Sequence, residues 1–116
     1  MPFAPKWTTQ ADATFRELQA AAATSLRSPA KSKKSKAGKA EGLFKQVEKT
    51  VRLLLDNPKH PGLKTHEFSS IEHPYVAGAK VFEAYVQNRT PGAYRLFWCY
   101  GPEKGEITII AITPHP

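Results

Sequence analysis

The chain has 116 residues, of which 41% are apolar, with a net charge of +7 and an isoelectric point of about 9.7. This length suits one modest hydrophobic core and excludes two independent ones. The basic charge favours a polyanionic partner such as RNA, DNA or an acidic protein. However, five lysines with no acidic residue between them lie in residues 31–39, which leaves only +2 for the rest of the chain.

The cysteine count and the hydropathy pattern bear on the compartment. The single cysteine, Cys99, excludes an intrachain disulfide, so a reducing compartment fits best. Cys99 lies in an apolar run and is expected to be a packed strand residue rather than a nucleophile. The first residues contain no apolar signal segment, and no run approaches the length of a membrane span. We therefore expect a cytoplasmic protein without a membrane segment.

Two helices are predicted in the first half of the chain. Apolar residues recur at steps of four, three and four over residues 10–26. A second, continuous apolar stripe runs from Phe44 to Leu55, and the Asn57-Pro58 pair should end that helix. Between the helices, residues 28–40 carry no apolar side chain larger than alanine, which predicts a flexible, lysine-rich linker. We expect this linker to lie within a single domain of residues 1–116.

The second half of the chain is predicted to form a sheet, because the apolar period changes there from 3.6 to 2. Strands are expected over residues 63–68, 80–86, 94–100 and 106–112. Short turn-rich connections separate the last three strands, which indicates an antiparallel meander. The expected fold is α+β in the order α-α-β-β-β-β, with two N-terminal helices packed on a four-stranded, mainly antiparallel sheet.

One face of this sheet is expected to be at least partly open to water. Strand alternation places Arg95 beside Phe97 on one face, and Glu83 and Tyr85 share a face of the preceding strand. The sequence contains no Gly-rich phosphate loop, metal-ligand spacing or Ser-His-Asp arrangement, so neither a metal nor a cofactor is expected. The residues expected to converge on the open face are Arg95, Glu83, Tyr85 and Lys64, with His115 at the end of the sheet.

Such a set of side chains suits RNA cleavage. Attack of a 2′-hydroxyl on the adjacent phosphate needs a base, a proton donor for the departing 5′-oxygen and a fixed cation. Arginine can contact a phosphate through two hydrogen bonds, while tyrosine or lysine can stack on or steer the RNA. The alternative is that these residues are solvated cross-strand partners without a catalytic role. His60, His66 and His73 lack ligand spacing and are expected in solvated loop or strand-edge positions.

Three features, in their order and spacing, resemble the RelE/ParE toxin superfamily. They are Leu53–Pro58 followed by Gly62-Leu63-Lys64, the strand Tyr94–Trp98 with its Tyr-Arg start, and the apolar closing strand Ile107–Ile112. The resemblance covers residues 41–116. It implies the toxin of a toxin–antitoxin pair, with a cognate antitoxin as partner. RelE-like members of the superfamily cleave messenger RNA on the ribosome without a metal.

The resemblance also assigns roles to individual residues. Arg95 matches the phosphate-binding arginine of the family, and His115 lies where many relatives carry a basic residue. Lys64 matches a basic position of the first strand, while Lys80 and Glu83 match charged positions of the second. The predicted catalytic residues are thus Arg95, His115 and Glu83, and the predicted RNA-binding residues are Lys64, Lys80 and Tyr85. The alternative function is a non-catalytic ParE-like inhibitor of DNA gyrase, or an orphan protein- or RNA-binding module on the same fold.

Overall fold

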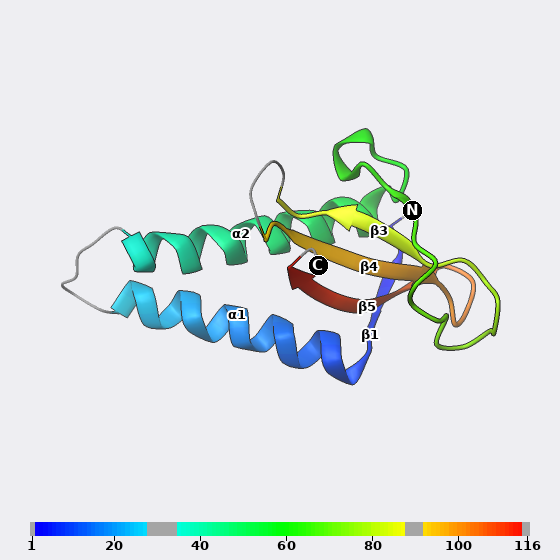
Figure 1. Cartoon of the computed structure of the whole chain (residues 1–116), viewed down its shortest axis with the longest axis horizontal. Coiled ribbons are helices and arrows are strands. Elements are labelled where there is room, and N and C mark those ends of the chain that lie inside the picture. Colours follow the sequence, from blue (N-terminus) through cyan, green and yellow to red (C-terminus); the bar gives the residue numbers. More distant parts are fainter. Residues whose placement is uncertain (1, 28–34, 88–91, 115–116) are drawn as a thin grey trace.

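The computed structural model describes residues 2–27, 35–87 and 92–114 of the chain. Two helices, α1 (Thr9–Arg27) and α2 (Ser35–Asp56), pack side by side as a hairpin that projects beyond the sheet (Figure 1). Thr8 caps the start of α1, since its hydroxyl accepts a hydrogen bond from the Ala11 amide at 3.0 Å. The helix α2 ends directly before Asn57-Pro58, the pair predicted to stop it.

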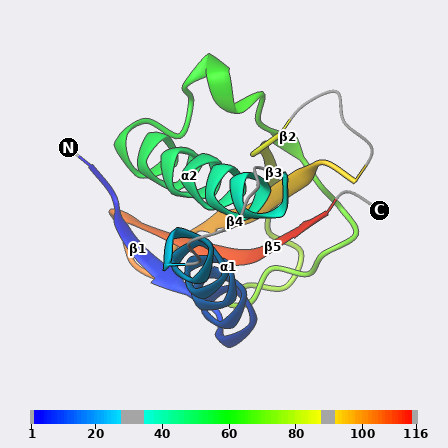
Figure 2. The same ribbon diagram turned by 90° about the vertical axis from the view of Figure 1, so that its left-hand side faces the viewer.

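In the described part of the chain, five strands form one sheet in the order β1-β5-β4-β3-β2. Neighbouring strands are antiparallel except β1, which pairs in parallel with β5. Both helices lie on the same face of the sheet (Figure 2), so the predicted α+β fold is confirmed. The strands are β1 (Ala4–Trp7), β2 (His66–Glu67), β3 (Phe82–Tyr85), β4 (Tyr94–Tyr100) and β5 (Glu106–Pro114).

The predicted strand count was wrong by one, because β1 was not expected. Only four residues long and interrupted by Pro5, β1 offers little periodicity from which a strand can be recognised. Proline is tolerated here because β1 lies at the edge of the sheet. The neighbouring aromatic residues hold β1 in place: Trp7 packs on Phe15 of α1 with ring centroids 5.0 Å apart. The element order is therefore β-α-α-β-β-β-β.

Two predicted segments differ from the structure by three residues or more at one boundary. Part of the predicted linker, residues 35–40, belongs to α2, because its Lys and Ala residues are good helix formers; residues 28–34 lie outside the described residues. The predicted strand 63–68 is shortened to the two residues of β2. The 3₁₀ helix η1 (Pro61–Leu63) occupies its start, and Lys64 follows in the left-handed region with φ 50°, which breaks an extended strand.

The sheet buries side chains on both faces. Under the helices, Leu96 and Trp98 of β4 pack into the larger cluster with Leu54 of α2. On the opposite face, Phe97 and Cys99 are buried in a second cluster, as expected of Cys99. The expectation of an open face is corrected here, because the segment between β2 and β3 covers this side. Its Phe68 ring lies 4.7 Å from that of Phe97.

Candidate functional site

A buried ion pair marks the end of the second sheet face, where β3 and β4 leave the apolar cluster. Tyr85 is the register partner of Arg95, and Glu83 is the partner of Phe97, so Glu83 and Arg95 are diagonal neighbours on one face. The Arg95 Nε atom lies 3.5 Å from Glu83 Oε2. The two side chains are only 10% and 3% exposed, so little solvent screens the pair.

His66 extends this pair to the surface. It is the register partner of Glu83 on the edge strand β2, and its Nε2 atom lies 2.6 Å from Glu83 Oε1. The other ring nitrogen, Nδ1, lies 3.2 Å from the carbonyl oxygen of Lys64. Both ring nitrogens therefore face acceptors, and a doubly protonated imidazolium can donate to both at once. The His66 side chain is 49% exposed, so solvent reaches it, in contrast to the buried Glu83 and Arg95.

The Arg95 guanidinium is held by further contacts within the protein. Its Nη1 atom donates to the carbonyl oxygens of Gln87 at 2.8 Å and Tyr94 at 3.2 Å. Its central carbon lies 3.8 Å from the centroid of the Tyr85 ring, in cation–π geometry. The Tyr85 ring in turn meets the His66 ring edge-on at 5.9 Å. We call His66, Glu83, Tyr85 and Arg95 the edge cluster.

The structure brings together three of the predicted site residues, Arg95, Glu83 and Tyr85. Lys64 adjoins them through its carbonyl contact to His66, and its side chain is exposed. Lys80 is turned to other partners: it pairs with Glu67 at 3.2 Å, beside a cavity of about 500 Å³ that residues 67–73 and 78–81 line. The remaining predicted residue, His115, lies outside the described residues.

His66 is the member of the edge cluster that the sequence reasoning did not select. It had been expected in a solvated strand-edge position, and it does lie on the edge strand with half of its side chain exposed. The signal that identifies it is the pairing of its strand with Glu83, seventeen residues further along the chain. A carboxylate that holds one imidazole nitrogen fixes the orientation of the ring, which is what proton transfer by histidine requires.

The described residues contain no group of three or more His, Cys, Asp or Glu side chains placed to hold a metal ion. Nor, within those ranges, is any helix both long and apolar enough to cross a membrane.

Comparison with known proteins matches the fold rather than the sequence. No family model and no curated protein sequence matches the chain. Two solved structures match it over almost their whole lengths, each with 11% identity. The chain shares the fold of these two structures, which agrees with the resemblance of its sequence motifs.

Both matching structures are YoeB-type toxins. The YoeB/ParE toxin from Agrobacterium tumefaciens aligns with a TM-score of 0.59 over 97% of this chain and 99% of its own. The YoeB dimer from Staphylococcus aureus aligns with a TM-score of 0.55 over the full length of both chains. At 11% identity the similarity is one of fold alone, and it covers nearly the whole chain, including the helical hairpin and the sheet that carries the edge cluster.

Proposed function

We propose that this protein is the toxin of a toxin–antitoxin pair and that it acts as a metal-independent endoribonuclease on messenger RNA. The observation that carries the proposal is the edge cluster: a half-exposed His66 held by the buried carboxylate of Glu83, on the fold of YoeB/ParE toxins. A cognate antitoxin would then be its protein partner. The site of action would be the cytoplasm, with the messenger RNA bound at the ribosome.

The reaction we propose is an intramolecular transesterification at one phosphate of the RNA strand. The 2′-hydroxyl loses its proton to a base, and its oxygen bonds to the adjacent phosphorus. The bond from phosphorus to the 5′-oxygen breaks, and that oxygen takes up a proton, which leaves a 2′,3′-cyclic phosphate and a 5′-hydroxyl. In this scheme His66 is the proton-transfer group and Glu83 keeps its ring oriented.

Arg95 enters this scheme differently from its predicted role as the phosphate clamp. Its contacts to Glu83, to two backbone carbonyls and to the Tyr85 ring make it a positioning residue for Glu83. Direct contact with a phosphate would require it to give up part of this set. Lys64, whose side chain is exposed and whose carbonyl oxygen contacts His66, is then our candidate for the positive charge that stabilises the phosphorane.

The test is induced expression followed by primer extension on a reporter transcript, comparing the wild type with His66→Gln. Glutamine keeps a donor near the position of Nε2, so the contact to Glu83 can persist while proton transfer is lost. We expect transcript cuts to fall by about 100-fold or more. His73→Gln is the matched control, since His73 lies in the segment between β2 and β3 and should leave the cuts unchanged. Cuts that persist within tenfold in His66→Gln would remove His66 from the mechanism.

A second candidate function is a non-catalytic ParE-like inhibitor of DNA gyrase, or a binding module on the same fold. The burial of Arg95 and Glu83 favours it, because both side chains use their charges inside the protein. Growth arrest with intact transcripts and altered plasmid supercoiling would establish this alternative over the endoribonuclease.

A further inference from the structure

A groove beside the edge cluster carries features that the proposed reaction has not used. It lies between α2, the η1 turn and the end of β3, and it encloses a cavity of about 440 Å³. This volume lies in the range of small-ligand sites. Among the described residues that line the groove there is no carboxylate. Its lining includes Gln46, Lys49 and Leu53 from α2, His60 before η1, and Tyr85 and Val86 from the end of β3.

The charge of the groove comes from Lys49. Two other cations of α2 are neutralised by carboxylates one turn away, Lys45 by Glu41 at 3.6 Å and Arg52 by Glu48 at 3.4 Å. Within the described ranges no carboxylate lies at ion-pair distance from Lys49, whose side chain is exposed. Its ammonium group is therefore available to an external anion.

His60 adds a hydrogen-bond donor to the same groove. Its Nδ1 atom accepts a hydrogen bond from the backbone amide of Gly62 at 2.9 Å. An accepting Nδ1 is unprotonated, so the neutral ring carries its proton on Nε2. The lining of the groove thus combines a lysine and a histidine with aliphatic and aromatic residues.

Tyr85 joins the groove to the edge cluster. This residue lines the groove, and its ring stacks on Arg95 and meets the His66 ring edge-on. Tyr85 therefore lies between the groove and His66. Cations with a neighbouring aromatic residue are typical of surfaces that bind single-stranded nucleic acid.

We propose that this groove is a nucleotide subsite for single-stranded RNA. It holds the nucleotide adjoining the scissile phosphate, with a backbone phosphate on Lys49 and the base against the Tyr85 and Val86 wall. This inference rests on the proposed endoribonuclease function and extends it, because it assigns the part of the RNA that lies outside the reacting phosphate. A protein segment is the competing occupant, and the test distinguishes the two.

The test measures binding without cleavage. The probe is a fluorescein-labelled RNA hexanucleotide with 2′-O-methyl groups throughout, which lacks the attacking hydroxyl. Its affinity is measured by fluorescence anisotropy between 50 and 200 mM salt. Loss of one phosphate contact lowers the slope of log affinity against log salt by about 0.7. We expect Lys49→Ala to show that change and to bind about three- to tenfold more weakly at 50 mM salt.

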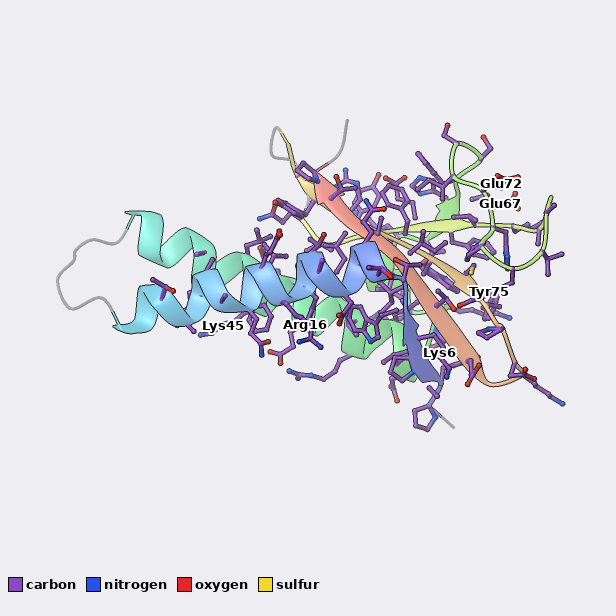
Figure 3. The ribbon with its side chains drawn as sticks, turned by 90° about the horizontal axis from the view of Figure 1, so that it is seen from below. Lys6, Arg16, Lys45, Glu67, Glu72 and Tyr75 are labelled. Atoms are coloured by element: carbon purple, nitrogen blue, oxygen red, sulfur yellow. The ribbon has the colours of Figure 1, made fainter. Side chains whose placement is uncertain are left out.

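Lys45→Ala is the matched control, since Lys45 (labelled in Figure 3) carries the same charge and lies one turn before Lys49 on α2. It should keep the slope of the wild type, because Lys45 is paired with Glu41 and does not line the groove. Equal losses in both variants would overturn the subsite, since they would report general charge alone. An unchanged Lys49→Ala, or a wild type that does not bind the probe, would overturn it in favour of a protein occupant.

The two proposals fail in different ways. If the protein binds the probe through Lys49 but cuts no transcript, the subsite is supported and the endoribonuclease is refuted. If the protein cuts transcripts but Lys49→Ala keeps the wild-type slope, the endoribonuclease is supported and the subsite is refuted.

Discussion

Removal of the Glu83 carboxylate should destabilise the protein strongly, because it would leave a buried cation without its anion. Glu83 contacts His66 at 2.6 Å and Arg95 at 3.5 Å, and its side chain is 3% exposed. In Glu83→Ala the Arg95 guanidinium keeps two carbonyl contacts and the Tyr85 ring, but no carboxylate. Breaking a buried pair from one side costs about 3–5 kcal/mol of unfolding free energy.

Urea unfolding followed by the fluorescence of the buried Trp98 measures this change. With a urea dependence of about 1.5 kcal/mol per molar, the midpoint should fall by about 2–3 M. The double variant Glu83→Leu/Arg95→Met replaces both partners by apolar side chains of similar size. It should be more stable than the two single variants predict together, by about 1–3 kcal/mol.

A loss of less than about 1 kcal/mol of unfolding free energy in Glu83→Ala would contradict the burial of this ion pair. Losses this small are typical of ion pairs open to water, so the result would mean that solvent reaches the Glu83–Arg95 pair. In that case Arg95 would also be free to make the phosphate contact that the family resemblance implies.

Two further predictions concern other parts of the fold. Burial raises the pKa of the Cys99 thiol from 9.0 to about 11, so at pH 8 the folded protein should react with a disulfide reagent at least about 100-fold more slowly than the unfolded chain; equal rates would contradict the buried position. Thr8→Ala removes the cap of α1 and a 2.7 Å hydrogen bond to the Ile110 carbonyl, so thermal unfolding should show a loss of about 1–2 kcal/mol that Thr8→Ser largely restores. A loss as large in Thr8→Ser would indicate that the methyl group, rather than the hydroxyl, stabilises this corner.

The fold could be predicted where local periodicity is strong. The strand Tyr94–Tyr100 has the predicted bounds, and α1 differs from its predicted range by one residue at each end. The strand β1 could not be recognised, because its pairing with β5 is a contact across the whole chain and its own four residues carry no pattern. The early start of α2 was not predicted because residues 35–40 have helix propensity but no apolar face, so no periodicity marks them as helical.

The sequence predicts which face of the sheet carries the candidate residues, but not how far they are buried. Strand alternation alone placed Arg95, Glu83 and Tyr85 on one face, and the register confirms it. The face that they share is covered next to them by Phe68 and Ile71, which pack on the second cluster from a segment without periodicity. A single sequence does not reveal such a cover, because it depends on tertiary packing rather than on a local rule.

The parallel pairing of β1 with β5 has a consequence for the order in which the protein is completed. Ala4 pairs with Glu106 and Trp7 with Ile109, so the first strand to be synthesised must wait for the last. Until β5 is available, β1 has no partner strand, and Phe3 and Trp7 have no sheet edge that fixes their positions against the core. Contacts so distant along the chain slow folding. A nascent chain in which residues 106–114 are not yet available therefore has the helical hairpin without its finished sheet, and this sheet is complete only once β5 can pair with β1.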